Sequence, residues 1–203
     1  MYDYTLQQLL LRLAILLPVL AVHGGAVAVT AAALGDKGVR HDGRCTLNPL
    51  VHLDLIGLLS ALFFSVGWVK PIAIDEAALR GGRPALLLPV VAGFGAVVAL
   101  VPLLLFLRAA LLPHLPETGA ETLFALVTVS GPLAISFALA NLLPLPPFSG
   151  GLLLQAASPA LARPLVRART VAGLLMLALA WFGLIGRLLA PGEALLAGLL
   201  LRH

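Results

Sequence analysis

Two kinds of side chain in this sequence could do chemistry, the histidines and one serine hydroxyl. Histidines stand at positions 23, 41, 52, 114 and 203, and Ser149 lies in the glycine-flanked segment FSGG. A serine nucleophile needs a base within hydrogen-bond reach, so its chemistry depends on which histidine the fold brings near. A lone histidine in an apolar helix more often hydrogen-bonds a neighbour inside a bundle, and we favour that structural role for His23.

The composition indicates a membrane protein. Of the 203 residues, 61% are hydrophobic and 11% are charged, against roughly 45–50% and 25% in soluble domains. A crossing takes about 20 apolar residues. We therefore expect an all-α membrane protein, a single polytopic helical bundle over residues 1–203 with about five to six transmembrane segments. The net charge of +4 is scattered along the chain, which gives no basic face for a nucleic-acid partner.

Apolar stretches separated by charges, glycines and prolines predict where the spans lie. The expected spans are about 9–34, 50–68, 85–112, 122–143 and 170–189, the first being a retained N-terminal span, with a half-helix over 150–162 and a short interfacial tail from Pro191. Lys70–Pro84 is expected to be a short extended or hairpin loop. Asn141–Gly151 (NLLPLPPFSGG) is expected to be a re-entrant stretch, because irregular backbone persists at membrane depth only where it is buried in protein or lines a cavity.

Three stretches resemble the site-2 protease family of intramembrane zinc metalloproteases, and together they cover nearly the whole chain. His23–Asp36 (HGGAVAVTAAALGD) lines up with the family's zinc helix, where H-E-x-x-H precedes an apolar stretch and a Gly-Asp step. Gly43–Pro71, with TLNPLVHLD and GWVKP, resembles the segment that follows that helix. Asn141–Gly151 resembles N-x-x-P-x-x-x-x-D-G-G, whose aspartate is the third zinc ligand. The resemblance implies the family's core fold and a place in the bacterial inner (cytoplasmic) membrane.

The positions that match the family's catalytic residues have changed. In H-E-x-x-H the two histidines bind zinc one helical turn apart, and the glutamate takes a proton from the bound water. Here His23 keeps the first ligand, whereas Gly24 stands at the base and Val27 at the second ligand. Ser149 replaces the aspartate. Since a zinc site needs about three protein ligands, the resemblance implies a degenerate, inactive member that binds no zinc.

The framework positions of the family are kept, as far as the resemblance extends. The matching structural motif comprises Asn48, Pro49, His52, Asp54, Trp68, Lys70 and Pro71. A groove for a substrate or partner is expected around Asn141, Pro144, Pro147, Gly150, Gly151 and Gly93. This groove could hold an extended peptide by strand addition. Alternatively, the proline-rich loop could plug the old cavity, and the sequence alone does not decide between the two.

A preserved framework with altered catalytic positions favours a pseudoprotease. We expect a scaffold or accessory subunit that works in the lipid bilayer and binds a transmembrane helix or a larger membrane protein complex. The alternative is an intramembrane peptidase with altered chemistry, which would use a residual metal at His23 or a Ser149/His23 pair that the family fold would bring together. A small transporter has little support, because the expected spans hold few ionisable residues.

Overall fold

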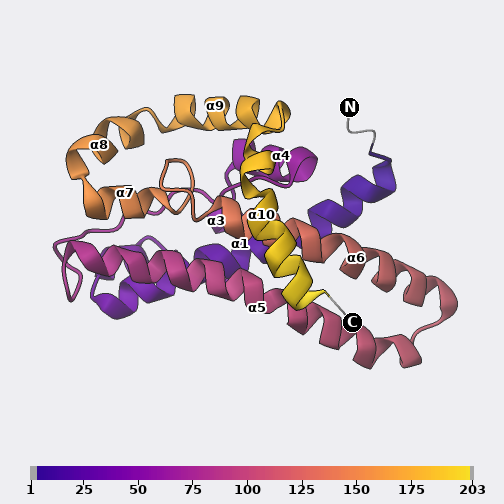
Figure 1. Ribbon diagram of the computed structural model, residues 1–203. Coiled ribbons are helices and arrows are strands. Elements are labelled where there is room, and N and C mark those ends of the chain that lie inside the picture. Colours follow the sequence, from indigo (N-terminus) through magenta and orange to yellow (C-terminus); the bar gives the residue numbers. More distant parts are fainter. Residues whose placement is uncertain (1–3, 202–203) are drawn as a thin grey trace.

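The computed structural model describes residues 4–201, and within that range the regular elements are helices alone. In chain order they are α1 (Leu6–Leu34), α2 (Lys37–His41), α3 (Pro49–His52), α4 (Leu55–Phe64), η1 (Arg83–Leu86), α5 (Leu87–Leu111), η2 (Leu112–His114), α6 (Glu117–Ala140), α7 (Gly151–Ala157), α8 (Pro159–Arg167), α9 (Arg169–Trp181) and α10 (Leu184–Leu200). The predicted all-α membrane fold is confirmed, and Figure 1 shows its arrangement.

Three segments among the described residues are long and apolar enough to cross a membrane: α1, the continuous stretch Arg83–His114 that contains α5, and α6. A fourth crossing would require α8 and α9 to act as one span, although the two are bent by 84°. The structure therefore has three to four candidate spans in place of the five to six expected from hydropathy.

The apolar stretch over residues 50–68, expected to cross steeply or only in part, contains no helix long enough for a full crossing. The structure divides it into the end of α3 and the ten-residue helix α4. At about 1.5 Å per residue, α4 is about 15 Å long, which is half of a hydrocarbon layer. Its start is capped by Asp54, whose Oδ1 accepts the N–H of Gly57 at 2.9 Å. It ends because Ser65 takes a left-handed φ of 62°.

The C-terminal third also differs from the expectation. The predicted span over 170–189 breaks at Gly183, whose φ is 69°, and this break separates α9 from α10. Helix α10 then continues through Pro191 to Leu200 in place of a short interfacial tail. The expected half-helix over 150–162 is two helices, α7 and α8. The span predicted over 122–143 begins earlier and ends at Ala140.

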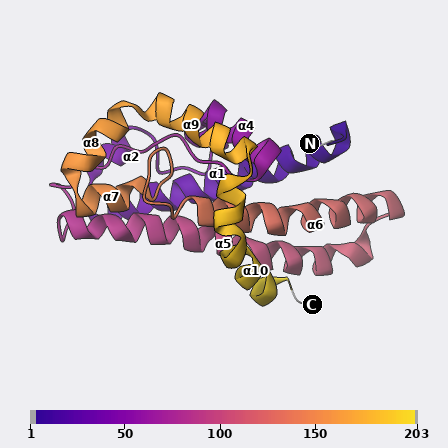
Figure 2. The same cartoon turned by 45° about the horizontal axis from the view of Figure 1, so that its top comes forward.

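The long helices form one layer, and the later, shorter helices lie over it. Helix α1 packs against α5 and α6, and α10 crosses α6; Figures 1 and 2 show α5 and α6 side by side, joined at the end farthest from α8. The buried core between α1, α5 and α6 includes Leu16, Leu20, Val97, Leu133 and Phe137. Trp68 lies between the layers, where it packs against Phe148.

Helix α4 is fixed to α1 by a buried arginine. Arg12 is 7% exposed. Its guanidinium donates to the carbonyl oxygens of Ala61, at 3.0 Å, and Leu62, and to the hydroxyl of Ser65 at 2.8 Å. Because the last carbonyls of a helix have no partner within the helix, this charge satisfies the C-terminal end of α4.

Residues 66–75 run as irregular backbone between α4 and the next turn, as the expected extended loop requires. The Lys70 N–H donates to the carbonyl of His52 at 2.7 Å, and the Asp75 N–H donates to the Asp36 carboxylate at 2.9 Å. Between these two anchors, the backbone groups of residues 72–74 form no hydrogen bond with any residue in the described range. A short unpaired backbone edge results.

At Gly93, α5 approaches α1 closely, and Gly95 provides a matched control. A Cβ at Gly93 would lie 2.7 Å from Cγ2 of Val27 and 2.8 Å from Cε1 of His23, whereas a Cβ at Gly95 would have nothing within 4 Å. We expect Gly93→Ala to destabilise the bundle by about 1–3 kcal/mol through overpacking. Gly95→Ala should be neutral or stabilising by up to about 1 kcal/mol, because alanine favours helix. Thermal unfolding in detergent measures both, and equal shifts for the two variants would contradict the α1–α5 packing.

Candidate functional site

His23 and Ser149, which the resemblance assigns to one site, are in contact. His23 lies in the middle of α1 and is fully buried. Its Nε2 is 2.8 Å from Oγ of Ser149, which lies in the loop between α6 and α7. The imidazole also packs edge-on against Phe137 of α6, with ring centroids 5.6 Å apart. Two positions that are 126 residues apart in the sequence therefore share one hydrogen bond at the centre of the fold.

Val27 and Gly93 close the other side of this imidazole. Val27 is one turn after His23 on α1 and is 1% exposed. A Cβ at Gly93 would meet both Val27 and the imidazole, 3.0 Å from its Nδ1. Within the described residues, this Nδ1 is buried and has no hydrogen-bond partner. The second nitrogen of His23 is therefore not held by any side chain.

Gly24 faces a second buried histidine. A Cβ at Gly24 would overlap the imidazole of His52, so His52 occupies the space that a side chain at position 24 would need. The Nε2 of His52 lies 2.9 Å from the carbonyl of Thr46. Burial lowers the pKa of His52 below its ordinary value; the hydrogen bond to Thr46 opposes this effect, and the nearby Arg44 adds to it. His52 is thus a neutral packing residue at neutral pH.

The residues predicted to form a structural motif do connect α3, α4 and the extended segment. Asp54 caps α4 and also accepts the indole N–H of Trp68 at 3.2 Å. The carbonyl of His52 accepts the Lys70 N–H at 2.7 Å. Asn48 caps α3 through the N–H of Leu50 at 3.1 Å. These contacts fix where the unpaired backbone edge begins.

Asn141 determines the shape of the loop that carries Ser149. It is 1% exposed. Its Nδ2 donates to the carbonyls of Gly67 and Phe137, both at 2.9 Å, and its Oδ1 accepts the Ser149 N–H at 3.3 Å. The Asn141 carbonyl accepts the Gly150 N–H at 2.8 Å. One residue therefore joins the end of α6, the segment after α4 and the serine loop.

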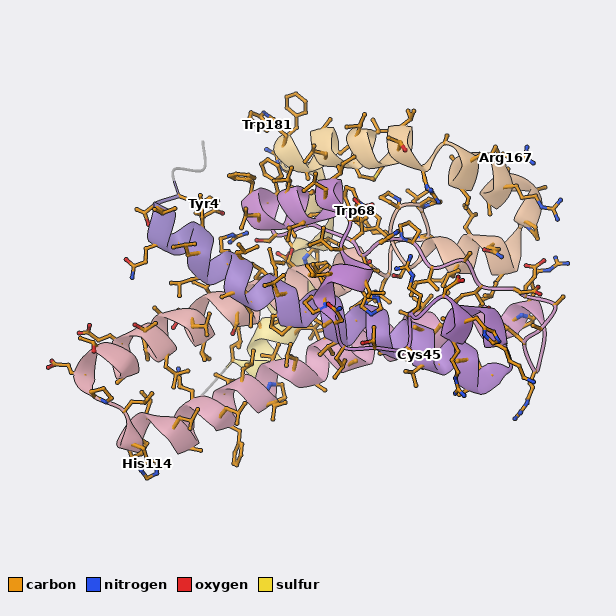
Figure 3. The ribbon with its side chains drawn as sticks, turned by 180° about the vertical axis from the view of Figure 1, so that it is seen from behind. Tyr4, Cys45, Trp68, His114, Arg167 and Trp181 are labelled. Carbon is orange, nitrogen blue, oxygen red and sulfur yellow. The ribbon has the colours of Figure 1, made fainter. Side chains whose placement is uncertain are left out.

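A cavity of about 310 Å³ lies beside Ser149. Its walls are residues 71–74, the loop residues 146–149, helix α7 and the corner between α8 and α9. Figure 3 labels Arg167 at that corner, far from Trp181 at the other end of α9. Besides the Ser149 hydroxyl, two polar side chains line the cavity, Gln155 and Arg169.

The expected groove overlaps this cavity only in part. Pro147 and Gly151 line it. Asn141, Pro144, Gly150 and Gly93 do not, although Asn141 supports one wall through Ser149. Residues 72–74, Gln155 and Arg169 also line the cavity, and they were not among the site residues predicted from the sequence. The short apolar run PIAI inside a charged loop was a signal for the first of these, whereas no local signal identified Arg169.

The residues at this site do not fit a zinc ion. Across residues 4–201, no three His, Cys, Asp or Glu side chains come close enough together to hold a metal. Val27 presents methyl groups one turn from His23, and the Ser149 hydroxyl is neutral and already hydrogen-bonded to the imidazole. Gly24 offers no carboxylate to take a proton from water.

The Ser149–His23 pair lacks two parts of a hydrolytic site. A base needs a third group that orients its other nitrogen. Nδ1 of His23 has no side-chain partner among the described residues, and the group beside it is the backbone of Gly93, which carries no charge. An acyl-transfer site also needs free donors for the oxyanion. The backbone N–H groups of Ser149 and Gly150 flank the hydroxyl, but both donate to Asn141.

The geometry predicts how a zinc site could be restored. Val27→His together with Ser149→Asp should create, with His23, a set of three ligands, and we expect about one zinc per chain after dialysis. The wild-type chain should retain far less under the same treatment, as measured by plasma mass spectrometry. Adding Gly24→Glu should not restore proteolysis by itself, because His52 occupies the space for that side chain. His23→Ala in the double variant is the control, and equal zinc in both would show that the three positions do not converge.

Comparison with known proteins gives one curated similarity. The chain is 35% identical over 136 residues to the protein named "Putative zinc metalloprotease YwhC" of Bacillus subtilis (strain 168). The match covers 64% of this chain and 60% of that relative, so the chain matches less than two thirds of the relative's length. No protein-family model matches the chain, and no solved structure matches it. The apolar helices indicate an integral membrane protein, and part of the chain is similar in sequence to this protein named as a putative zinc metalloprotease.

Proposed function

We propose that this chain is a non-catalytic site-2 protease-like protein that holds an extended part of a membrane partner, as a scaffold or accessory subunit. One observation carries the proposal: the cavity of about 310 Å³ lies beside a position that has no base and no second metal ligand. Space for a polypeptide is thus present where the chemistry to cut it is missing.

The unpaired backbone edge supports a polypeptide as the occupant. Residues 72–74 line the cavity, and their backbone groups have no hydrogen bond within the described part of the chain. Backbone donors and acceptors in folded proteins are almost always paired when they are covered. An extended segment laid along this edge would pair them in the manner of strand addition.

The proline-rich loop favours binding over plugging. Pro146, Pro147 and Phe148 contribute to the wall of the cavity, and a volume of about 310 Å³ remains beside them. The side chains of the loop leave this space beside Ser149 unfilled. The loop is fixed in this position by Asn141, which places its Ser149 end.

Photocrosslinking from inside the cavity tests the proposal. A photoreactive amino acid at Ile72 or Leu152, which line the cavity, should form an adduct with one recurring membrane protein in native membranes. The same amino acid at Leu103, which is 50% exposed on α5, should form adducts mainly with lipid. Mass spectrometry identifies the adducts. Protein adducts of equal yield from Leu103, or none from the cavity positions, would contradict the proposal.

A second candidate function is a peptidase based on serine and histidine, which the 2.8 Å contact between Ser149 and His23 favours. Because the flanking N–H groups donate to Asn141, we expect no cleavage of a model transmembrane peptide and no labelling of Ser149 by a fluorophosphonate. Cleavage by the wild-type chain that is lost in both Ser149→Ala and His23→Ala would establish the peptidase instead.

A further inference from the structure

We infer that the polypeptide held in the cavity carries an acidic side chain, and that Arg169 binds its carboxylate. This inference rests on the proposed function and names the chemistry of the partner: an extended, mostly apolar segment with one aspartate or glutamate.

Arg169 is the single formally charged residue in the cavity lining. The other lining residues are apolar or neutral, and they include Ile72, Phe148 and Leu152. A guanidinium at the edge of an apolar cavity selects for a carboxylate, because it can donate two parallel hydrogen bonds to it. The cavity therefore offers one point of charge recognition and an apolar surface next to it.

Within residues 4–201, no carboxylate forms an ion pair with Arg169. Asp54 shares a smaller cavity of about 60 Å³ with Arg169, yet the two form no ion pair, and Oδ1 of Asp54 instead accepts from the backbone of Gly57 and the indole of Trp68. The ion pair found among the described residues joins Arg83 to Glu76 at 3.5 Å. Arg169 thus makes no ion pair within residues 4–201.

The neighbouring arginines differ from Arg169 in their surroundings. Arg163 and Arg167 line a separate cavity of about 250 Å³, which also includes the carboxylate residue Glu76. That cavity therefore contains both signs of charge, whereas the cavity beside Ser149 contains the guanidinium alone. Arg167 is two residues from Arg169, and both residues are exposed, which makes Arg167 a matched control.

The backbone edge distinguishes a peptide from a fatty acid. A fatty acid would also place a carboxylate beside an apolar chain, but its chain has no groups to pair with residues 72–74. An extended peptide satisfies both features at once, since its backbone pairs with the edge while one side chain reaches Arg169. The backbone edge at residues 72–74 and the side chain of Arg169 line the same cavity.

A two-hybrid selection in bacterial membranes tests this inference with the full chain. The probe is a library in which a constant apolar span is followed by about eight randomised residues, which reach about 27 Å when extended. With the wild-type chain, we expect Asp or Glu to be enriched about fivefold at one randomised position. Arg169→Glu should change that preference to Lys or Arg, and Arg169→Gln should abolish it while segments are still selected. Arg167→Glu should leave the acidic preference in place.

The outcomes of this selection distinguish the role of Arg169 from the proposed binding of a polypeptide. Selection of segments without any charge preference would overturn the role of Arg169 and leave the binding function standing. A shift with Arg167→Glu as large as with Arg169→Glu would also overturn it, because a general surface field would then explain the preference. Failure to select any segment would overturn both the docking function and this inference.

Discussion

The buried amide of Asn141 is the interaction on which the site depends. It donates to two carbonyls on different segments and accepts from the Ser149 backbone, and its own carbonyl accepts from Gly150. Asn141 is buried, and its side chain satisfies three backbone groups while its own backbone carbonyl satisfies a fourth. These bonds fix the relative positions of the groups, since each would be costly to leave unpaired. The same hydrogen bonds that build one wall of the cavity also occupy the N–H groups that catalysis would require.

The two positions that match the family's base and second ligand are closely packed in this chain. At the position that matches the base, Gly24 leaves space that the His52 imidazole occupies. At the position that matches the second ligand, Val27 packs beside Gly93. Interiors are packed at nearly crystalline density, so such replacements do not leave the original site open. The cavity that remains is displaced from this centre towards residues 72–74 and α7.

The long apolar helices could be predicted from the sequence, and the shorter helices could not. Segments α1, α5 and α6 follow from apolar runs of sufficient length, whereas the breaks at Ser65 and Gly183 depend on single left-handed residues within equally apolar sequence. At the site, the resemblance identified His23, Ser149 and Asn141 as neighbours. It could not identify Arg169, because its place at the cavity depends on the 84° bend between α8 and α9, which tertiary packing determines.

The shortness of the unpaired edge limits how a partner can be held. Three residues, 72–74, offer only a few backbone hydrogen bonds, each worth about 1 kcal/mol net. Together they amount to about 2–4 kcal/mol, so the edge alone corresponds to a dissociation constant near or above the millimolar range. Such an affinity is useful only when the ligand is already confined near the site at a comparable effective concentration. Co-residence in one bilayer supplies that confinement, so occupancy would follow the local abundance of the ligand in the membrane and exchange would be fast.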